Sequence, residues 1–269
     1  MSFHKLEHLS GEKNSPLFIA GPCVMESREL VYEAADFLAG LKAHGLKIIM
    51  KFSYDKANRT SKDSYRGPGI EEGMKIIADV RKRSKLPILV DVHTPQEASL
   101  MADAADIIQI PAFLCRQTSL IEAAGATGCF VNIKKGQFMS PYAMKQQADK
   151  ALSAGAAGVF LTERGTFFGY GDLVVDMRSM VIMKKSGFPV IFDATHSQQK
   201  PASSGSETGG AREFIEPLSL AALSVGADGF FFEIHPRPNE ALSDRETQMD
   251  FESFEALALK LQKKGSRQD

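Results

Sequence analysis

Residues 87–111 read PILVDVHTPQEASLMADAADIIQIP, and this stretch decides the fold. It contains two short runs rich in apolar residues, Pro87–His93 and Asp106–Pro111, on either side of a longer amphipathic segment. Nearly continuous apolar runs of this length are typical of strands that are buried on both faces. The stretch therefore predicts a strand, a helix and a second strand.

Strand followed by helix recurs along the whole chain. The alternation predicts a closed (β/α)8 TIM barrel, with a doubly wound open sheet as the runner-up. No glycine-rich dinucleotide fingerprint follows any predicted strand, which weakens the open sheet. The eight predicted strands are Leu17–Ala20, Lys47–Phe52, Pro87–His93, Asp106–Pro111, Cys129–Lys134, Gly158–Thr162, Pro189–Asp193 and Gly229–Ile234.

Three of the predicted helices have marked boundaries. Asp172–Ser186 is predicted to be helical, with Gly187 as its C-cap. Ser140 and Pro141 predict the N-cap and first turn of another helix. The spacing of the apolar residues in 251–261 predicts a final amphipathic helix.

The composition is that of an ordinary globular protein. Of the 269 residues, 43% are hydrophobic and 24% are charged, which excludes a disordered chain, a coiled coil and a collagen-like fibre. A barrel of about 200–250 residues fits this length as well as two smaller domains do. Since no composition break divides the chain, we expect one barrel domain over residues 1–269, with loose ends at about 1–13 and 263–269.

Charge and cysteine content narrow the partners and the compartment. The 32 basic and 33 acidic residues nearly cancel, so no nucleic-acid or membrane-surface partner is expected. No apolar run reaches 18 residues, so no membrane span is expected. The first 13 residues lack an apolar signal core and the chain has only three cysteines, which together favour the reducing cytoplasm.

Polar or ionisable residues end all eight predicted strands. In a barrel these ends lie at the catalytic face, whereas the interior is normally filled with branched aliphatic residues. Two long connections, 53–69 and 195–210, are expected at the same face, and the second, rich in serine and glycine, is expected to form a mobile lid. The strand ends therefore predict a site.

Five cations belong to this predicted rim. They are Lys51, Lys56, Arg59, Lys134 and Arg164. Gathered on one rim, they would bind phosphate or carboxylate groups. For any one of them alone, the alternative is a solvated surface side chain.

A second group of rim residues has metal-ligand chemistry. The eighth strand of a closed barrel lies between the seventh and the first, which brings Cys23, His196 and Glu233 together, and Asp244 in the next loop can fold over them. A mixed sulfur, nitrogen and oxygen donor set suits Zn²⁺ or Fe²⁺ better than Mg²⁺. The alternatives are a buried thiol for Cys23 and a hydrogen-bonded structural pair for His196 and Glu233.

The remaining candidates have open interpretations. Asp91 and His93 share a strand face, so they can bind substrate or metal or simply bond to each other. Cys115 and Cys129 are predicted to be core thiols.

Eleven ordered motifs carry a family resemblance. They are GPCVMES (21–27), KFSYDKANRTS (51–61), SYRGPG (64–69), VDVH (90–93), QIPAFLCRQT (109–118), NIKKGQF (132–138), ERG (163–165), FGYGDLVVDM (168–177), FDATHS (192–197), FFEIHP (231–236) and ALSD (241–244). From about residue 17 to 261 the sequence resembles the 3-deoxy-D-manno-octulosonate 8-phosphate synthases, also called 2-dehydro-3-deoxyphosphooctonate aldolases. The resemblance implies a (β/α)8 barrel and an assembly that is usually tetrameric. It also implies a role in lipopolysaccharide precursor synthesis.

The resemblance also implies a reaction and a substrate site. Phosphoenolpyruvate condenses with D-arabinose 5-phosphate and water, and phosphate is released. The residues that would hold phosphoenolpyruvate are Lys51, Ser53, Lys56, Gln109, Lys134, Arg164 and His196. Asn58, Arg59 and Ser61 would contact the sugar phosphate. The implied catalytic residues are Lys51, Asp91, His93, Lys134, Arg164 and His196.

The family has metal-dependent and metal-independent branches, and the independent branch carries Asn at the position of Cys23. Cys23 together with Asp244 therefore implies the metal-dependent branch, with a divalent ion such as Zn²⁺, Fe²⁺ or Mn²⁺. The four implied ligands are Cys23, His196, Glu233 and Asp244.

Two rival functions are weaker. A 3-deoxy-arabino-heptulosonate 7-phosphate synthase would use erythrose 4-phosphate, but that family has a Lys-Pro-Arg-Thr type motif where this chain has Lys56-Ala57-Asn58-Arg59. A non-catalytic barrel that binds sugar phosphates would be expected to have lost some of the implied site residues, and this chain keeps them all.

Overall fold

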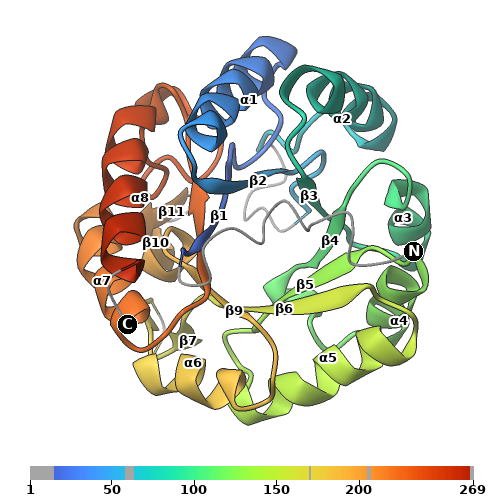
Figure 1. Ribbon diagram of the computed structural model, residues 1–269, viewed down its shortest axis with the longest axis vertical. Coiled ribbons are helices and arrows are strands. Elements are labelled where there is room, and N and C mark those ends of the chain that lie inside the picture. The colour runs from blue at the N-terminus through green and yellow to red at the C-terminus, as the bar shows by residue number, and fades with distance from the viewer. Residues whose placement is uncertain (1–14, 58–63, 170, 205–206, 267–269) are drawn as a thin grey trace.

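The computed structural model describes residues 15–57, 64–169, 171–204 and 207–266. Eight parallel strands close into a barrel in the order β1-β12-β9-β6-β5-β4-β3-β2, which confirms the predicted fold (Figure 1). The strands are β1 (Leu17–Gly21), β2 (Lys47–Phe52), β3 (Ile88–Asp91), β4 (Ile107–Ile110), β5 (Phe130–Lys134), β6 (Gly158–Glu163), β9 (Val190–Asp193) and β12 (Gly229–Glu233).

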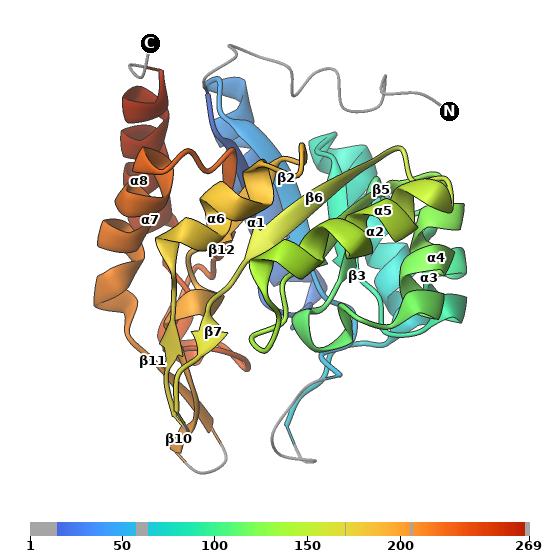
Figure 2. The same ribbon diagram turned by 90° about the horizontal axis from the view of Figure 1, so that it is seen from below.

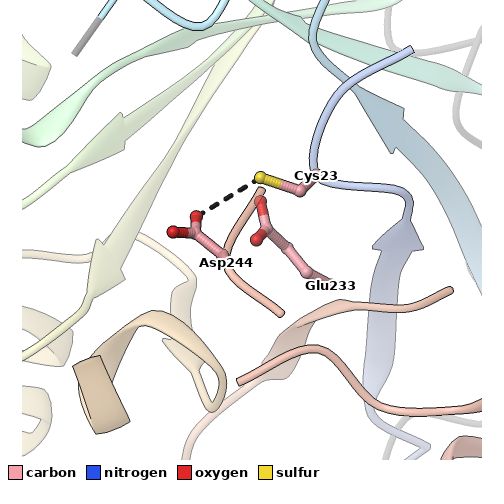
Figure 3. A group of neighbouring side chains, drawn as sticks. All are labelled: Cys23, Glu233 and Asp244. Atoms are coloured by element: carbon pink, nitrogen blue, oxygen red, sulfur yellow. Dashed lines mark hydrogen bonds between the residues drawn. The ribbon is translucent and has the colours of Figure 1, made fainter. Parts of the chain in front are cut away.

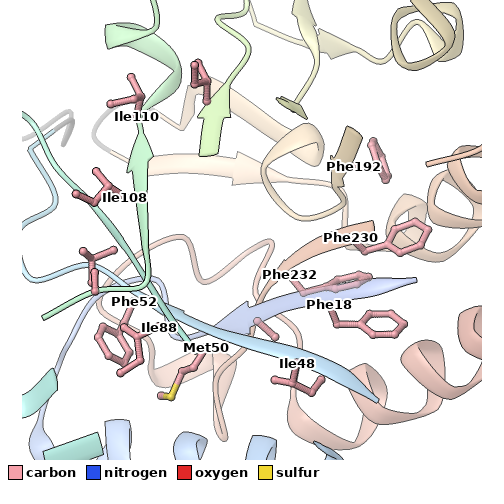
Figure 4. Packing of buried hydrophobic residues seen from close by; sticks show 14 of the residues in the cluster. Phe18, Ile48, Met50, Phe52, Ile88, Ile108, Ile110, Phe192, Phe230 and Phe232 are labelled. Atoms are coloured by element: carbon pink, nitrogen blue, oxygen red, sulfur yellow. The ribbon is translucent and has the colours of Figure 1, made fainter. Parts of the chain in front are cut away.

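Helices surround the barrel as an outer ring (Figure 1). They are α1 (Arg28–Ala43), α2 (Ile70–Ser84), α3 (Pro95–Met101), α4 (Thr118–Ala126), α5 (Met144–Ser153), α6 (Met177–Lys184), α7 (Ile215–Ser224) and α8 (Phe251–Gly265). Apolar side chains such as Phe18, Ile48 and Phe232 point from the strands toward these helices and form the larger core (Figure 4). No helix in the described ranges is both long and apolar enough to cross a membrane.

A second core lies inside the barrel and consists of one residue from each strand: Ile19, Ile49, Leu89, Ile107, Phe130, Phe160, Ile191 and Phe231. Strand side chains alternate between faces, so the residues two positions further along also point inward. These are Gly21, Lys51, Asp91, Gln109, Asn132, Thr162, Asp193 and Glu233. A polar layer therefore rests on an apolar floor, which is why polar strand ends predict the site.

Gly21 is the one position of this polar layer without a side chain. A Cβ atom there would lie 1.9 Å from the backbone oxygen of Lys51. Glycine therefore allows β1 to approach β2 closely beside the site.

The expected helix over 172–186 is wrong in its first part. Leu173–Val174 form a short strand, β8, which pairs antiparallel with β7 (Thr166–Phe167). Helix α6 begins only at Met177, because the side chain of Asp176 accepts a hydrogen bond from the backbone N–H of Arg178 and caps the helix there.

The other predicted boundaries have mixed outcomes. Pro141–Ala143 form a 3-10 turn, η4, that leads into α5, and the side chain of Ser140 makes no cap hydrogen bond. Helix α8 continues to Gly265, so 263–265 are helical and not loose, whereas residues 1–14 and 267–269 lie outside the described residues.

The long connection after β9 contains a hairpin. A 3-10 turn, η5 (His196–Gln198), is followed by β10 (Gln199–Ser204) and β11 (Glu207–Gly210), which pair antiparallel. Figure 2 shows this hairpin projecting from one end of the barrel, while α8 ends at the opposite end. Its movement as a lid stays a prediction.

Candidate active site

The polar layer and the strand ends above it contain many ionisable groups that are almost completely buried. Lys51, Lys134 and Arg164 are at most 5% exposed, and Asp193 and Glu233 are fully buried. Charges buried to this extent are costly unless they are paired. Their contacts therefore show how the site is balanced electrostatically.

A chain of contacts runs from β5 across β9 to β12. The Nζ atom of Lys134 donates to Asp193 Oδ2 at 2.6 Å, and the same oxygen lies 2.8 Å from His196 Nδ1. On the other side of the imidazole ring, Nε2 lies 3.1 Å from Glu233 Oε1, which also accepts from Lys51 Nζ at 3.2 Å. Although burial opposes ionisation, His196 and Lys134 hold the pKa of Asp193 below its usual range, so this carboxylate stays charged.

The two lysines share an aromatic floor. The Nζ atom of Lys134 lies 3.7 Å from the centre of the Phe231 ring, and that of Lys51 lies 5.6 Å from it. The face of an aromatic ring attracts cations, particularly where water is excluded. Phe231 therefore supports both ammonium groups from below without neutralising them.

Arg164 differs from the other buried cations. Its guanidinium donates to the backbone oxygen of His196 at 3.2 Å and to Gln199 Oε1 at 2.5 Å. In the part of the chain that the structure describes, it forms no ion pair with a carboxylate. Burial lowers the pKa of Arg164, but a guanidinium remains protonated in proteins. Arg164 thus contributes a positive charge that no carboxylate of the described residues pairs with directly, although those of Asp193 and Asp244 act on it from a distance.

Gln109 is oriented by a relay of hydrogen bonds across the barrel. Thr162 Oγ1 donates to Asn132 Oδ1 at 2.7 Å, and Asn132 Nδ2 donates to Gln109 Oε1 at 2.8 Å. Since Oε1 is engaged in this way, the amide NH₂ of Gln109 remains available as a donor toward a ligand.

The predicted metal ligands gather where β1, β12 and the loop after β12 meet (Figure 3). One donor atom each from Cys23, Glu233 and Asp244 lies within 4.8 Å of the other two. The Cys23 Sγ to Asp244 Oδ2 distance is 3.3 Å. His196 Nε2 approaches this group, at 3.1 Å from Glu233 Oε1 and 3.9 Å from Asp244 Oδ2.

Lys56 lies in the middle of this donor group, whereas the sequence places it with the phosphoenolpyruvate-binding cations. Its Nζ atom is 2.6 Å from Cys23 Sγ, 2.9 Å from Asp244 Oδ2 and 3.7 Å from Glu233 Oε1. Burial opposes the charge of Lys56, but the surrounding carboxylates and thiol raise its pKa well above the ordinary value. Burial and the neighbouring carboxylates also raise the pKa of the Cys23 thiol.

Two further observations indicate that the donor atoms of Cys23, Glu233 and Asp244 could hold a cation. Glu233 Oε2 is buried and has no hydrogen-bond partner among the described residues. Asp244 has a φ of 46°, a left-handed conformation that is uncommon for a residue other than glycine and often marks a functional site. Its backbone oxygen accepts hydrogen bonds from the N–H groups of Thr247 and Gln248, which hold this conformation.

Asp91, His93 and Ser53 lie on the other side of Lys51. Ser53 Oγ donates to Asp91 Oδ1 in a short hydrogen bond, and Asp91 Oδ2 lies 3.5 Å from His93 Nε2. Burial would raise the pKa of Asp91, but His93, Lys51 and Ser53 lower it well below its usual range. The pair is therefore in contact, as one of the interpretations of the sequence predicts.

The match to known proteins covers almost the whole molecule. The sequence pattern of the DAHP synthetase I family matches residues 3–268. The chain belongs to the DAHP synthetase I family. It is 49% identical to the 2-dehydro-3-deoxyphosphooctonate aldolase of Protochlamydia amoebophila over 248 residues, which are 92% of this chain and 90% of the relative. It is 48% identical to the enzyme of the same name from Geobacter sp. (strain M21), over 90% and 89% of the two chains. The resemblance inferred from the motifs is thus confirmed.

Three of the predicted site residues lie outside the described residues, and two residues of the site were not predicted from the sequence. Asn58, Arg59 and Ser61, expected to contact the sugar phosphate, fall in the segment 58–63, which the structure does not describe. Asp193 and Phe231 were not predicted as site residues. Both stand at inward-facing strand positions, and inward-facing residues alternate along a strand. Phe231 lies two residues before Glu233 on β12, and Asp193 lies two residues after Ile191 on β9, so this alternation would have identified both.

Proposed function

We propose that the chain condenses phosphoenolpyruvate with D-arabinose 5-phosphate and water, forming 3-deoxy-D-manno-octulosonate 8-phosphate and phosphate, in lipopolysaccharide precursor synthesis in the cytoplasm. The observation that carries the proposal is the convergence of three buried cations: Lys51 and Lys134 lie over the Phe231 ring, and Arg164 donates to the backbone oxygen of His196, whose ring contacts Lys134. These buried cations suit the carboxylate and phosphate of phosphoenolpyruvate. The names of the relatives support the choice of sugar.

The reaction forms one C–C bond and one C–O bond to phosphoenolpyruvate and breaks the C–O bond that joins C2 to the phosphate. C3 of phosphoenolpyruvate attacks the aldehyde carbon of the sugar, whose oxygen takes up a proton, and the oxygen of water adds to C2 and loses a proton. The resulting hemiketal phosphate then breaks the bond between C2 and the phosphate oxygen while its C2 hydroxyl gives up a proton to the departing phosphate, which releases phosphate and leaves a ketone. Negative charge develops on the aldehyde oxygen and on the leaving phosphate.

The buried cations are placed to stabilise these charges. Lys134 is anchored by Asp193 and Phe231, and Lys51 by Glu233, so neither ammonium must reorganise during the reaction. Arg164, which has no carboxylate partner among the described residues, suits the phosphate that carries the most charge. Asp91 and His93 lie beside Lys51 and suit proton transfer at the aldehyde and water.

A divalent ion would be held by Cys23, His196, Glu233 and Asp244, and the chain is proposed to belong to the metal-dependent branch. Their sulfur, nitrogen and oxygen donors fit Zn²⁺ or Fe²⁺. Such an ion supplies Lewis acidity to an oxygen of substrate or water. The unpaired Oε2 of Glu233 supports this assignment, as does the attraction of the donors for a cation, which the ammonium of Lys56 among them illustrates.

A comparison of two sugars tests the proposed reaction. With phosphoenolpyruvate present, phosphate release is expected to be at least about 100-fold more efficient in kcat/KM with arabinose 5-phosphate than with erythrose 4-phosphate, since a site built for an extra hydroxyl discriminates against a substrate that lacks it. Preference for erythrose 4-phosphate would assign the sister activity. No release with either sugar would indicate a non-catalytic barrel.

The assembly is proposed to be a homotetramer, and exposed aromatic side chains support association. Phe113, Phe138, Phe167 and Phe168 are all exposed, the last to 75%. The first three lie in neighbouring segments: the N–H of Phe167 donates to Gln137 O at 3.1 Å, and a Cβ at Gly136 would lie 2.9 Å from the Phe138 ring and 3.0 Å from Ala112 O. Large exposed apolar patches mark interaction sites.

Light scattering after gel filtration should therefore give a mass about four times the 29.4 kDa of one chain. Phe138→Ser is expected to weaken association because it removes one of these exposed aromatic side chains. A mass of 29.4 kDa at assay concentration would refute the assembly.

A further inference from the structure

Glu97, in the first turn of α3, connects the capping of that helix to the ring of His93. Thr94 is the N-cap, and its Oγ1 accepts from the backbone N–H of Glu97 at 3.2 Å. In a standard capping box, the carboxylate would bond back to the backbone of the cap residue itself. Here Glu97 Oε2 instead accepts from the backbone N–H of His93 at 2.9 Å, one residue earlier.

The same oxygen also meets the imidazole ring. Glu97 Oε2 lies 3.1 Å from His93 Nδ1, while the other ring nitrogen, Nε2, lies 3.5 Å from Asp91 Oδ2. An ionised carboxylate can only accept hydrogen bonds, so Nδ1 must carry a proton in this arrangement. The carboxylates of Glu97 and Asp91 thus face both nitrogens of a ring that is 14% exposed.

Tyr54 completes the arrangement from the loop after β2. Its hydroxyl donates to Glu97 Oε2 at 2.6 Å, and its ring packs edge-on against that of His93 with 6.4 Å between the centroids. Tyr54 is closely packed against α2, since a Cβ atom added at Gly73 would lie only 2.5 Å from the Cβ atom of Tyr54. This packing fixes Tyr54 in turn. Glu97 Oε2 therefore has three donors and a single orientation.

We propose that Glu97 is a positioning residue, which holds the imidazole of His93 with Nδ1 protonated and Nε2 directed toward Asp91, and that Tyr54 fixes Glu97 in turn. The catalytic consequence rests on the proposed function, in which His93 lies at the reaction centre. The arrangement itself does not depend on that function.

The charges around His93 favour its cationic form. Burial lowers the pKa of the imidazole, but the carboxylates of Asp91 and Glu97 outweigh burial and raise it above the ordinary value. Tyr54 and His93 in turn keep the pKa of Glu97 low although burial opposes this. Among the described residues, the charge of Lys51 also acts on Asp91.

An NMR titration of the imidazole Cε1–Hε1 signals measures this role without substrate, with His93→Asn used to assign the signal. Glu97→Gln is expected to lower the pKa of His93, because it removes one of the two negative charges. Tyr54→Phe keeps the carboxylate and is expected not to lower it. An unchanged pKa of His93 in Glu97→Gln would overturn the proposal.

Two further variants separate positioning from folding. Thr94→Ala removes the helix cap but leaves Glu97 in place, so it is expected to lower thermal stability without shifting the pKa of His93. Glu97→Asp keeps the charge and is expected to hold the pKa of His93 between the values of wild type and Glu97→Gln. If Glu97→Gln does not fold, an unshifted pKa in Glu97→Asp, together with a shift in Thr94→Ala, overturns the proposal.

Kinetics then connect the arrangement to turnover. Glu97→Gln is expected to lower kcat by about tenfold with the KM for phosphoenolpyruvate unchanged, since general acid–base catalysis depends on the protonation and orientation of the group. An inactive wild type would refute the proposed function while the titration still decides the role of Glu97. A raised KM with unchanged kcat would overturn the role of Glu97 in catalysis.

Discussion

Replacement of Arg164 by methionine is expected to lower kcat/KM for phosphoenolpyruvate by about 10³-fold, or about 4 kcal/mol of transition-state stabilisation. The guanidinium is buried and paired only with neutral oxygens in the described part of the chain, so its charge is available to the phosphate of the substrate. Among the residues that the structure describes, its removal leaves no buried carboxylate without an ion-pair partner. The variant should therefore fold with stability close to that of the wild type.

Two other variants make this result interpretable. Arg83→Met removes a half-exposed guanidinium that pairs with Asp36 on the outer helices, and it is expected to leave kcat/KM unchanged. Lys134→Met, by contrast, leaves Asp193 buried beside an apolar side chain, so it should lower both activity and thermal stability. Wild-type kcat/KM in Arg164→Met would remove Arg164 from the substrate site.

Replacement of Cys23 by alanine is expected to remove the bound divalent ion and with it most of the turnover. Loss of a residue that merely supports a metal ligand costs about 10–100-fold in affinity, so loss of the thiolate ligand should cost more than about 100-fold. Elemental analysis of purified protein measures metal content, and phosphate release measures turnover. Substrate binding, followed by calorimetry with phosphoenolpyruvate, should be partly retained, because Cys23 contacts Lys56 but the contacts of Lys134 and Arg164 do not involve it.

The chain offers its own control for this experiment. Cys115 is also a fully buried thiol, but it lies outside the donor group, so Cys115→Ala should keep both metal and activity. Cys23→Asn imitates the metal-independent branch, so its activity is expected to resist chelator. Full activity of Cys23→Ala in the presence of chelator would exclude a metal role.

The barrel was predictable because its strands are buried on both faces and therefore consist of apolar runs that end in polar residues. Pro189–Asp193 is an example: the structure places β9 at Val190–Asp193. Helix starts were harder to predict. Leu173 and Val174 fit the spacing of a helix equally well. They form a strand because they pair with β7, and the spacing of apolar residues does not reveal this pairing.

The chemistry of the site was predictable residue by residue, but its pairing was not. Lys134 and Arg164 stand at strand ends, and the barrel brings them to one rim. Asp193 pairs with Lys134, whereas Arg164 has no carboxylate partner among the described residues, and this difference depends on side-chain geometry across β5, β6 and β9. Likewise, the position of Lys56 among the metal donors depends on how the loop after β2 folds back over β1.

The apolar floor beneath the polar layer separates two tasks that an engineer would want to change independently. Positions such as Ile19, Leu89 and Ile107 can be repacked for heat resistance without touching a catalytic atom. Conversely, acceptor preference can be evolved by exchanging rim positions while the scaffold below stays constant. Phe231, which belongs to the floor and yet contacts two lysines of the rim, couples both tasks and should be excluded from a mutagenesis library.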